Sequence, residues 1–174
     1  MENIVWKLWK ESSFETASEL RVQACKYSWA IPTPKAINRL VDCGPIVEIG
    51  AGSGYWAALI TKAGGDVVAY DIQDEKFNFV ENFHEVEHGG PEKAALHPDR
   101  TLFLCWPSYC STFAREALKA YQGNTVVYIG EWRGCCATGS FFETLNNEWA
   151  EIETIDIPQW EGIHDCMIIF ERKK

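Results

Sequence analysis

The sequence contains no apolar run long enough to cross a membrane as a helix, although 47% of its residues are hydrophobic. Its first residues, MENIVWKLWKESS, lack the long apolar core and the small-residue cleavage site of a secretory signal. These two absences lead us to expect a cytoplasmic protein that makes no contact with a membrane.

Cysteine and histidine are present, but not in the spacings of a metal site or a disulfide framework. The seven cysteines include no C-x-x-C pair, their number is odd, and Cys135 and Cys136 are adjacent. The four histidines are scattered, without the spacing of zinc ligands. We therefore expect reduced thiols and no metal ion.

Positive charge is scarce, because 16 Lys and Arg residues stand against 25 Asp and Glu residues and give a net charge of −9. Residues 74–99 carry seven acids and two lysines, and no basic stripe is present elsewhere. Such a field repels phosphate-rich molecules. The composition therefore argues against a nucleic acid partner.

The length of 174 residues suits one domain with a full core, and neither an internal repeat nor a low-complexity run divides it. We expect a single domain over 1–174, with an N-terminal helical cover over 1–43 and a core over 44–174. Within the cover, apolar spacing predicts a helix over 12–25. Thr33 and Pro34 form a good N-cap and N1 pair for a second helix over 34–43.

From residue 46 onward, strands and helices alternate. The strands IVEIG, DVVAYDI and TVVYIG are apolar enough to be buried on both faces, which is typical of a parallel sheet. The last two strands, EIETIDIPQW and HDCMIIFERK, are predicted to form an antiparallel hairpin. The fold class is therefore α/β, doubly wound, with a mostly parallel sheet and a C-terminal antiparallel hairpin. The remaining expected strand is 101–107, and the expected helices are 54–64, 111–123 and 139–149.

The segment 73–100 is harder to assign. It fits a helix and one short strand, and FHEVEHG at 83–89 is our candidate for that strand.

A glycine loop follows the first strand, in PIVEIGAGSGYWAALI at 45–60. Such a turn brings backbone N–H groups and a helix N-terminus close to a ligand. The dinucleotide fingerprint G-x-G-x-x-G needs a small third position, but a start at Gly50 places the large Tyr55 there, and a start at Gly52 begins too late. Asp71, 21 residues after Gly50, ends the second strand, where an acid can hold ribose hydroxyls.

The pattern Glu48-x-Gly50-x-Gly52-x-Gly54 resembles motif I of the class I methyltransferases, which use S-adenosylmethionine (SAM). The resemblance covers roughly 45–174 and includes the closing hairpin. It implies a Rossmann-like methyltransferase fold with SAM as cofactor, Asp71 on the ribose, the glycine loop at the methionine end, and Glu48 organising that loop. We also assign Tyr55 and Cys105 to the cofactor side.

The stretch Cys105-Trp106-Pro107-Ser108-Tyr109 stands where amino-methylating members that act on nucleic acid bases carry Asp or Asn, Pro, Pro, then Tyr or Phe. The acid or amide that would accept from the target amine is missing. This difference argues against base methylation, which is kept as a minor alternative.

Tryptophan is common at the predicted ligand edge of the sheet. Trp106, Trp132 and Trp160 follow strand ends, Trp29 comes just before the first strand, and Trp56 opens the helix after the glycine loop. Each could be a separate hydrophobic plug. Together they predict an aromatic-walled acceptor pocket that favours a flat or amine-bearing small molecule. The substrate-binding candidates are Trp29, Trp106, Trp132 and Trp160.

Three residues are candidates for acid–base chemistry. Glu131 ends a buried strand and could accept a proton or merely cap the next loop. Tyr109 could position a nucleophile or pack. His164 lies in the loop between the last two strands, and an imidazole can exchange a proton near neutral pH, although a solvated turn is the simpler interpretation.

The sequence thus predicts a SAM-dependent methyltransferase that acts on a small-molecule acceptor. The alternatives are a non-catalytic SAM-binding protein, a nucleic acid base methyltransferase and an NAD-dependent oxidoreductase.

Overall fold

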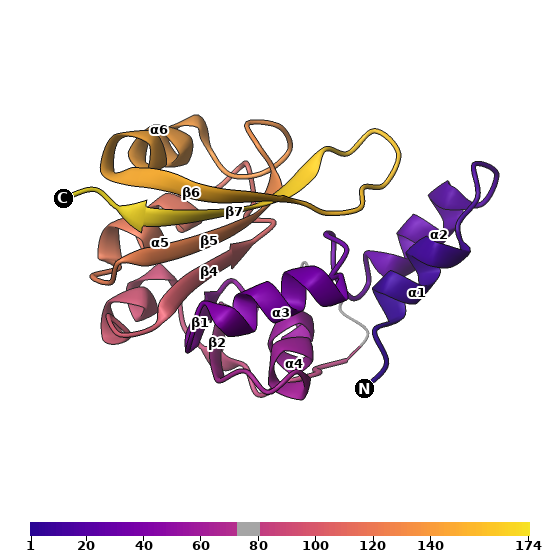
Figure 1. The fold of residues 1–174 in the computed structure, drawn as a ribbon, viewed down its shortest axis with the longest axis horizontal. Coiled ribbons are helices and arrows are strands. Elements are labelled where there is room, and N and C mark those ends of the chain that lie inside the picture. Colours follow the sequence, from indigo (N-terminus) through magenta and orange to yellow (C-terminus); the bar gives the residue numbers. More distant parts are fainter. Residues whose placement is uncertain (73–80) are drawn as a thin grey trace.

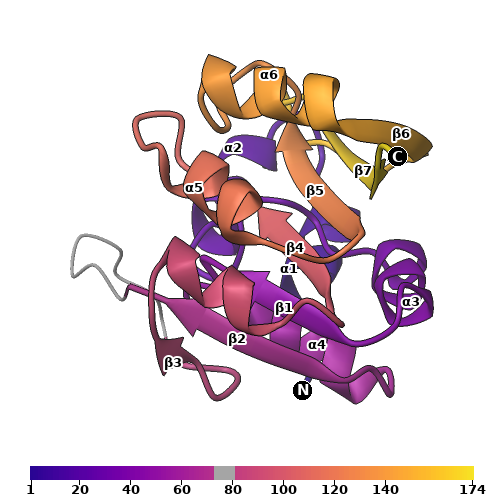
Figure 2. The same ribbon diagram turned by 90° about the vertical axis from the view of Figure 1, so that its left-hand side faces the viewer.

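A computed structural model describes residues 1–72 and 81–174 (Figure 1). Its described strands form a seven-stranded sheet in the order β3-β2-β1-β4-β5-β7-β6, in which β3 lies at the edge beside β2 (Figure 2). The strands are β1 Ile46–Ile49, β2 Val67–Asp71, β3 Glu87–His88, β4 Thr101–Cys105, β5 Thr125–Glu131, β6 Trp149–Asp156 and β7 Asp165–Arg172.

The first five strands of the sheet run parallel, and β7 lies antiparallel to both β5 and β6. This arrangement confirms the predicted α/β class, the mostly parallel sheet and the C-terminal hairpin. The short third strand falls inside the predicted range 83–89, because Glu87 and His88 pair with Tyr70 and Asp71. Residues 73–80, which belong to the segment where we also expected a helix, lie outside the described residues.

Helices cover both faces of the sheet (Figure 2). Helices α3 Pro34–Asp42 and α4 Tyr55–Lys62 pack on one face, and α5 Phe113–Ala120 and α6 Gly139–Glu148 pack on the other. Successive side chains of a strand point to opposite faces, so Ile46 joins the first core while Val47 joins the second. Burial on both faces explains why these strands read as continuous apolar runs. A 3₁₀ helix, η1 Pro91–Leu96, precedes β4.

Two further helices, α1 Ile4–Glu11 and α2 Ala17–Ala24, lie beyond the carboxyl ends of the parallel strands (Figure 1). The α2 helix confirms the helix predicted within 12–25. The backbone N–H of Val5 donates to the Tyr55 hydroxyl at 3.3 Å, which joins α1 to α4. Within the described parts of the chain, every helix is too short or too polar to span a bilayer.

Helix α3 begins as the sequence predicts. The hydroxyl of Thr33 accepts from the Ala36 backbone N–H at 3.0 Å, and Pro34 occupies the first helical position. The cap satisfies one of the N–H groups that a helix leaves without a partner at its N-terminus. It therefore fixes where the chain turns into α3 before entering β1.

We predict that Thr33→Ala lowers the free energy of unfolding by about 1 kcal/mol, because the Ala36 amide loses its acceptor. Thr33→Ser keeps a hydroxyl and is the matched control, expected within a few tenths of a kcal/mol of the wild type. Urea unfolding followed by circular dichroism measures both. Equal stabilities of the two variants would show that the cap contributes nothing.

Candidate functional site

The glycine loop between β1 and α4 is fixed to the end of β2. The backbone N–H groups of Gly50 and Ala51 donate to the Tyr70 carbonyl at 2.8 and 3.0 Å. The N–H of Gly52 donates to the Asp71 carboxylate at 2.8 Å. The motif glycine and the acid that the sequence assigned to the cofactor are therefore in direct contact.

All three motif glycines adopt positive φ angles, of 81° at Gly50, 56° at Gly52 and 72° at Gly54, a region that side chains disfavour. At Gly54, space is also restricted. A Cβ there would lie 2.8 Å from Val86 Cγ2 and 2.9 Å from His84 Cβ. Glycine therefore lets the loop press against the segment that leads into β3.

Two buried polar atoms lie in this motif without a hydrogen-bond partner among the described residues. They are Oε2 of Glu48, whose side chain is 1% exposed, and the hydroxyl of Ser53. Burial raises the pKa of Glu48 to about 8, against the lowering effect of the Ala57 amide, and the charge of Asp71 adds to the rise. Leaving such groups unpaired is costly. Polar atoms of this kind fit a motif that receives a polar ligand.

The other two residues assigned to the cofactor are Tyr55, which begins α4, and Cys105, which ends β4. The side chain of Tyr55 is buried, accepts from Val5 and packs against Tyr27 and Phe83, so it serves the α1–α4 contact and only its backbone belongs to the loop. Cys105 ends β4, and burial, followed by the charge of Glu48, holds the pKa of its thiol well above the ordinary value.

The structure brings Trp29 and Trp106 together. Their rings are stacked with centroids 5.2 Å apart and an interplanar angle of 21°. The indole N–H of Trp106 donates to both oxygens of the Asp165 carboxylate, at 3.0 and 2.9 Å. Trp29 lies in the segment between α2 and α3, so the N-terminal cover reaches the end of β4 at this point.

The wider aromatic wall predicted from the sequence is not formed. Trp132 packs on the α6 face of the sheet, with its ring 4.6 Å from that of Phe142 and 5.9 Å from that of Phe170. Trp160 is buried in the opposite core. Trp56 is also buried there and donates to the Ser28 hydroxyl at 2.8 Å. The acceptor wall therefore reduces to Trp29 and Trp106, because Trp56 and Trp160 are buried in one core and Trp132 packs against the other.

Glu131 has the geometry of the capping alternative. Its carboxylate accepts from the Cys135 backbone N–H at 2.8 Å, from the His164 backbone N–H at 3.2 Å, and lies 3.1 Å from His164 Nδ1. The Cys135 amide, then His164, lowers the pKa of Glu131 to about 2. A carboxylate this acidic and this well bonded is a poor proton acceptor at neutral pH.

The remaining catalytic candidates lie at the surface. The His164 side chain is 77% exposed and its contact is with Glu131. Tyr109 is 63% exposed, on the loop after β4. Because both side chains are largely exposed, they do not lie in an enclosed catalytic site.

Asp165 is a residue to which the sequence interpretation assigned no role. It opens β7, pairs with Glu131 across the strands and is 1% exposed. Burial raises the pKa of Asp165 to about 6, the hydrogen bond from Trp106 opposes the rise, and the charge of Glu131 adds to it. The available signal was an acid at the start of a long apolar strand, DCMIIF, directly after the candidate residue His164.

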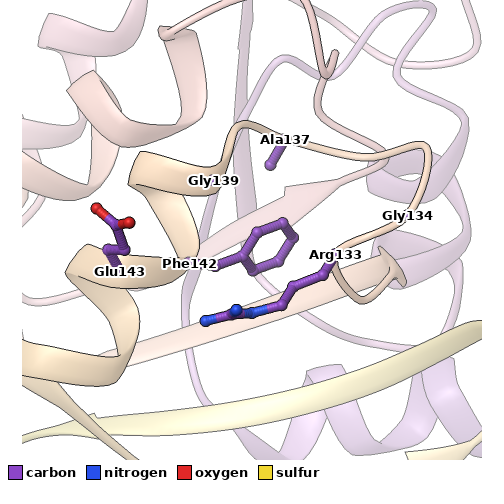
Figure 3. A pocket seen from close by; sticks show the side chains of 6 residues that line it. All are labelled: Arg133, Gly134, Ala137, Gly139, Phe142 and Glu143. Atoms are coloured by element: carbon purple, nitrogen blue, oxygen red, sulfur yellow. The ribbon is translucent and has the colours of Figure 1, made fainter.

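A surface pocket of about 260 Å³ opens beside the loop that joins β5 to α6 (Figure 3). Neither the glycine loop nor the Trp29–Trp106 pair contributes to its lining, which consists of Arg133, Gly134, Ala137, Gly139, Phe142 and Glu143. The pocket is therefore separate from the residues described above.

We predict that Asp165 makes the stability of the chain depend on pH. Since folding raises its pKa, the folded chain holds a proton that the unfolded chain has released, and this stabilisation is lost as the pH rises through about 6. Relative to Asp165→Asn, the wild type should lose about 2 to 3 kcal/mol of unfolding free energy between pH 4 and pH 7.5.

Urea unfolding at several pH values measures this difference. Asp99→Asn, which removes an exposed acid before β4, is the matched control and should follow the wild type. A constant gap between the wild type and Asp165→Asn across this range would contradict the prediction.

Comparisons with known proteins give similarity in structure alone. No family model matches the sequence, and no curated protein matches it. Solved structures do match. One is magnesium protoporphyrin IX methyltransferase (ChlM) from Synechocystis with bound SAM, with a TM-score of 0.59 and 11% identity over 97% of this chain and 90% of that one.

Two further structures are similar at the same level. The N-methyltransferase NodS from Bradyrhizobium japonicum has a TM-score of 0.54 and 12% identity, over 80% of this chain and 94% of that one. A protein of the NADB-Rossmann superfamily from Streptococcus agalactiae has a TM-score of 0.54 and 11% identity, over 82% and 70%. Strand order, antiparallel hairpin and these likenesses agree: the chain has the class I, Rossmann-like methyltransferase fold.

Proposed function

We propose that this protein binds SAM and transfers its methyl group to a small-molecule acceptor. The observation that carries the proposal is the glycine loop, in which the Gly52 amide bonds Asp71 while a buried oxygen of Glu48 has no partner among the described residues. The likeness to ChlM, solved with bound SAM, and to the N-methyltransferase NodS supports the same conclusion at the level of the fold.

Each part of the loop fits one part of the cofactor. The positive-φ glycines leave the backbone open to close approach, and the Asp71 carboxylate is suited to ribose hydroxyls. Glu48 and Ser53 offer buried polar atoms to the polar methionine end. A cation near Glu48 would favour its ionised form and lower its pKa from about 8. SAM itself supplies an activated methyl group, so the protein has to bind, align and exclude water.

The acceptor side of the proposal rests on Trp29 and Trp106, at the end of β4. Their stacked rings suit a flat or amine-bearing small molecule. Nucleic acid bases fit less well, since the indole of Trp106 is engaged by Asp165 at the position where an acid or amide would be needed.

A second candidate function is non-catalytic SAM binding. It is favoured by the state of the nearby acids, because Glu131 is held by hydrogen bonds and Asp165 is buried and bonded to the indole of Trp106. Turnover separates the two candidates, since only an enzyme yields S-adenosylhomocysteine (SAH) in the presence of an acceptor.

We predict that calorimetric titration detects binding of SAM and SAH to the wild type and that Asp71→Asn weakens both by at least about tenfold. Asparagine can still accept from the Gly52 amide through its side-chain oxygen, but it loses the charged acceptor for the ribose hydroxyls.

Asp99→Asn makes the same change in charge just before the amino end of β4, away from the glycine loop. This variant should bind both compounds like the wild type. NAD is titrated in parallel. Absence of SAM and SAH binding, or tighter binding of NAD, would refute the proposed function.

A further inference from the structure

Backbone strain is concentrated at the ends of β4 and β5. Among residues 1–72 and 81–174, the non-glycine residues with positive φ are Trp106 at 50°, Arg133 at 57° and Ala137 at 52°. All three lie in the loops that follow these strands. Such conformations are unfavourable for residues with a Cβ and persist where the surroundings hold them, commonly at ligand sites.

Trp106 is held from three directions. Its backbone N–H donates to the Ile129 carbonyl at 2.8 Å, its indole N–H donates to both Asp165 oxygens, and its ring stacks on Trp29. A ring fixed in this way cannot reorient without losing several contacts. The fixed orientation is what a preformed binding surface requires.

Trp29 gives the pair its accessible surface. Its side chain is 42% exposed, yet the residues on either side of it are buried, and Ser28 accepts from the indole of Trp56 at 2.8 Å. The backbone of Trp29 is therefore anchored while its ring remains open to solvent. An exposed, anchored indole stacked on a second indole forms an aromatic platform, defined here as Trp29 and Trp106.

Asp165 places negative charge at the indole N–H edge of Trp106. Its carboxylate accepts hydrogen bonds from the indole N–H of Trp106, and this raises the electron density of the ring face, which attracts cations. The other ionisable groups that act on Asp165 are Glu131, Arg21 and His164. Because Asp165 is buried, water screens its charge poorly.

We propose that the aromatic platform binds a planar aromatic cation and that Asp165 is the positioning residue that sets the preference for positive charge. Resting on the proposed function, this inference narrows the acceptor to a heteroaromatic ring with a nitrogen that carries no hydrogen. The nitrogen lone pair forms the bond to the methyl carbon, the carbon–sulfur bond breaks with its electrons remaining on sulfur, and the ring becomes the cation. No proton leaves, so no general base is needed, in keeping with the bonded state of Glu131.

Two matched probes test the preference by calorimetry at pH 8. The cation is 1-methylquinolinium, and the neutral probe is 4-methylquinoline, which has the same rings and the same number of heavy atoms. We expect the wild type to bind the cation about tenfold more tightly than the neutral probe. Asp165→Asn should abolish most of this preference, whereas Asp99→Asn, with the same change in charge, should retain it.

Equal affinity for the two probes, no binding of either probe, or an unchanged preference in Asp165→Asn would overturn the inference. If Asp165→Asn does not fold, Trp29→Leu takes its place and should weaken both probes at least about fivefold, and unchanged affinities would overturn the platform. SAH is titrated into every variant. If the wild type prefers the cation but does not bind SAH, the result contradicts the proposed function alone. If the wild type binds SAH but shows no preference for the cation, the result contradicts the platform alone.

Discussion

The parallel alignment of β1, β2, β4 and β5 places the carboxyl ends of these strands at one edge of the sheet. Parallel strands need both faces covered, so apolar side chains go to the two cores and the polar chemistry is confined to the loops at the strand ends. The glycine loop, Asp71, Trp106 and Glu131 all lie at such ends. Reversing one of these strands would move its carboxyl end to the opposite edge of the sheet, a strand length away.

Local patterns predicted the parts of the structure that depend on neighbouring residues. The cap of α3, the glycine loop and the short strand at Glu87 are encoded within a few positions of the chain. The partners of Trp106 and Glu131 are not, because Asp165 and His164 return to them from a distant strand. Sequence alone could place these side chains at one edge, but it could not decide which tryptophans stay exposed and which fill a core.

Three carboxylates at this edge show how strongly local surroundings set acidity. Burial raises the pKa of Glu48 to about 8 and that of Asp165 to about 6, while hydrogen bonds lower that of Glu131 to about 2. Raised values mean that folding disfavours the charged form, so the edge holds groups that lower stability at neutral pH. Such costs are typical of sites kept for binding rather than for packing.

The contact between Tyr55 and Val5 has a mechanical consequence. Tyr55 follows Gly54 directly and begins α4, and its hydroxyl accepts from the backbone of α1. Any displacement of α1 therefore pulls on the residue next to the glycine loop. A partner that binds the N-terminal helices would therefore act on the glycine loop at the carboxyl edge of the sheet through this one hydrogen bond.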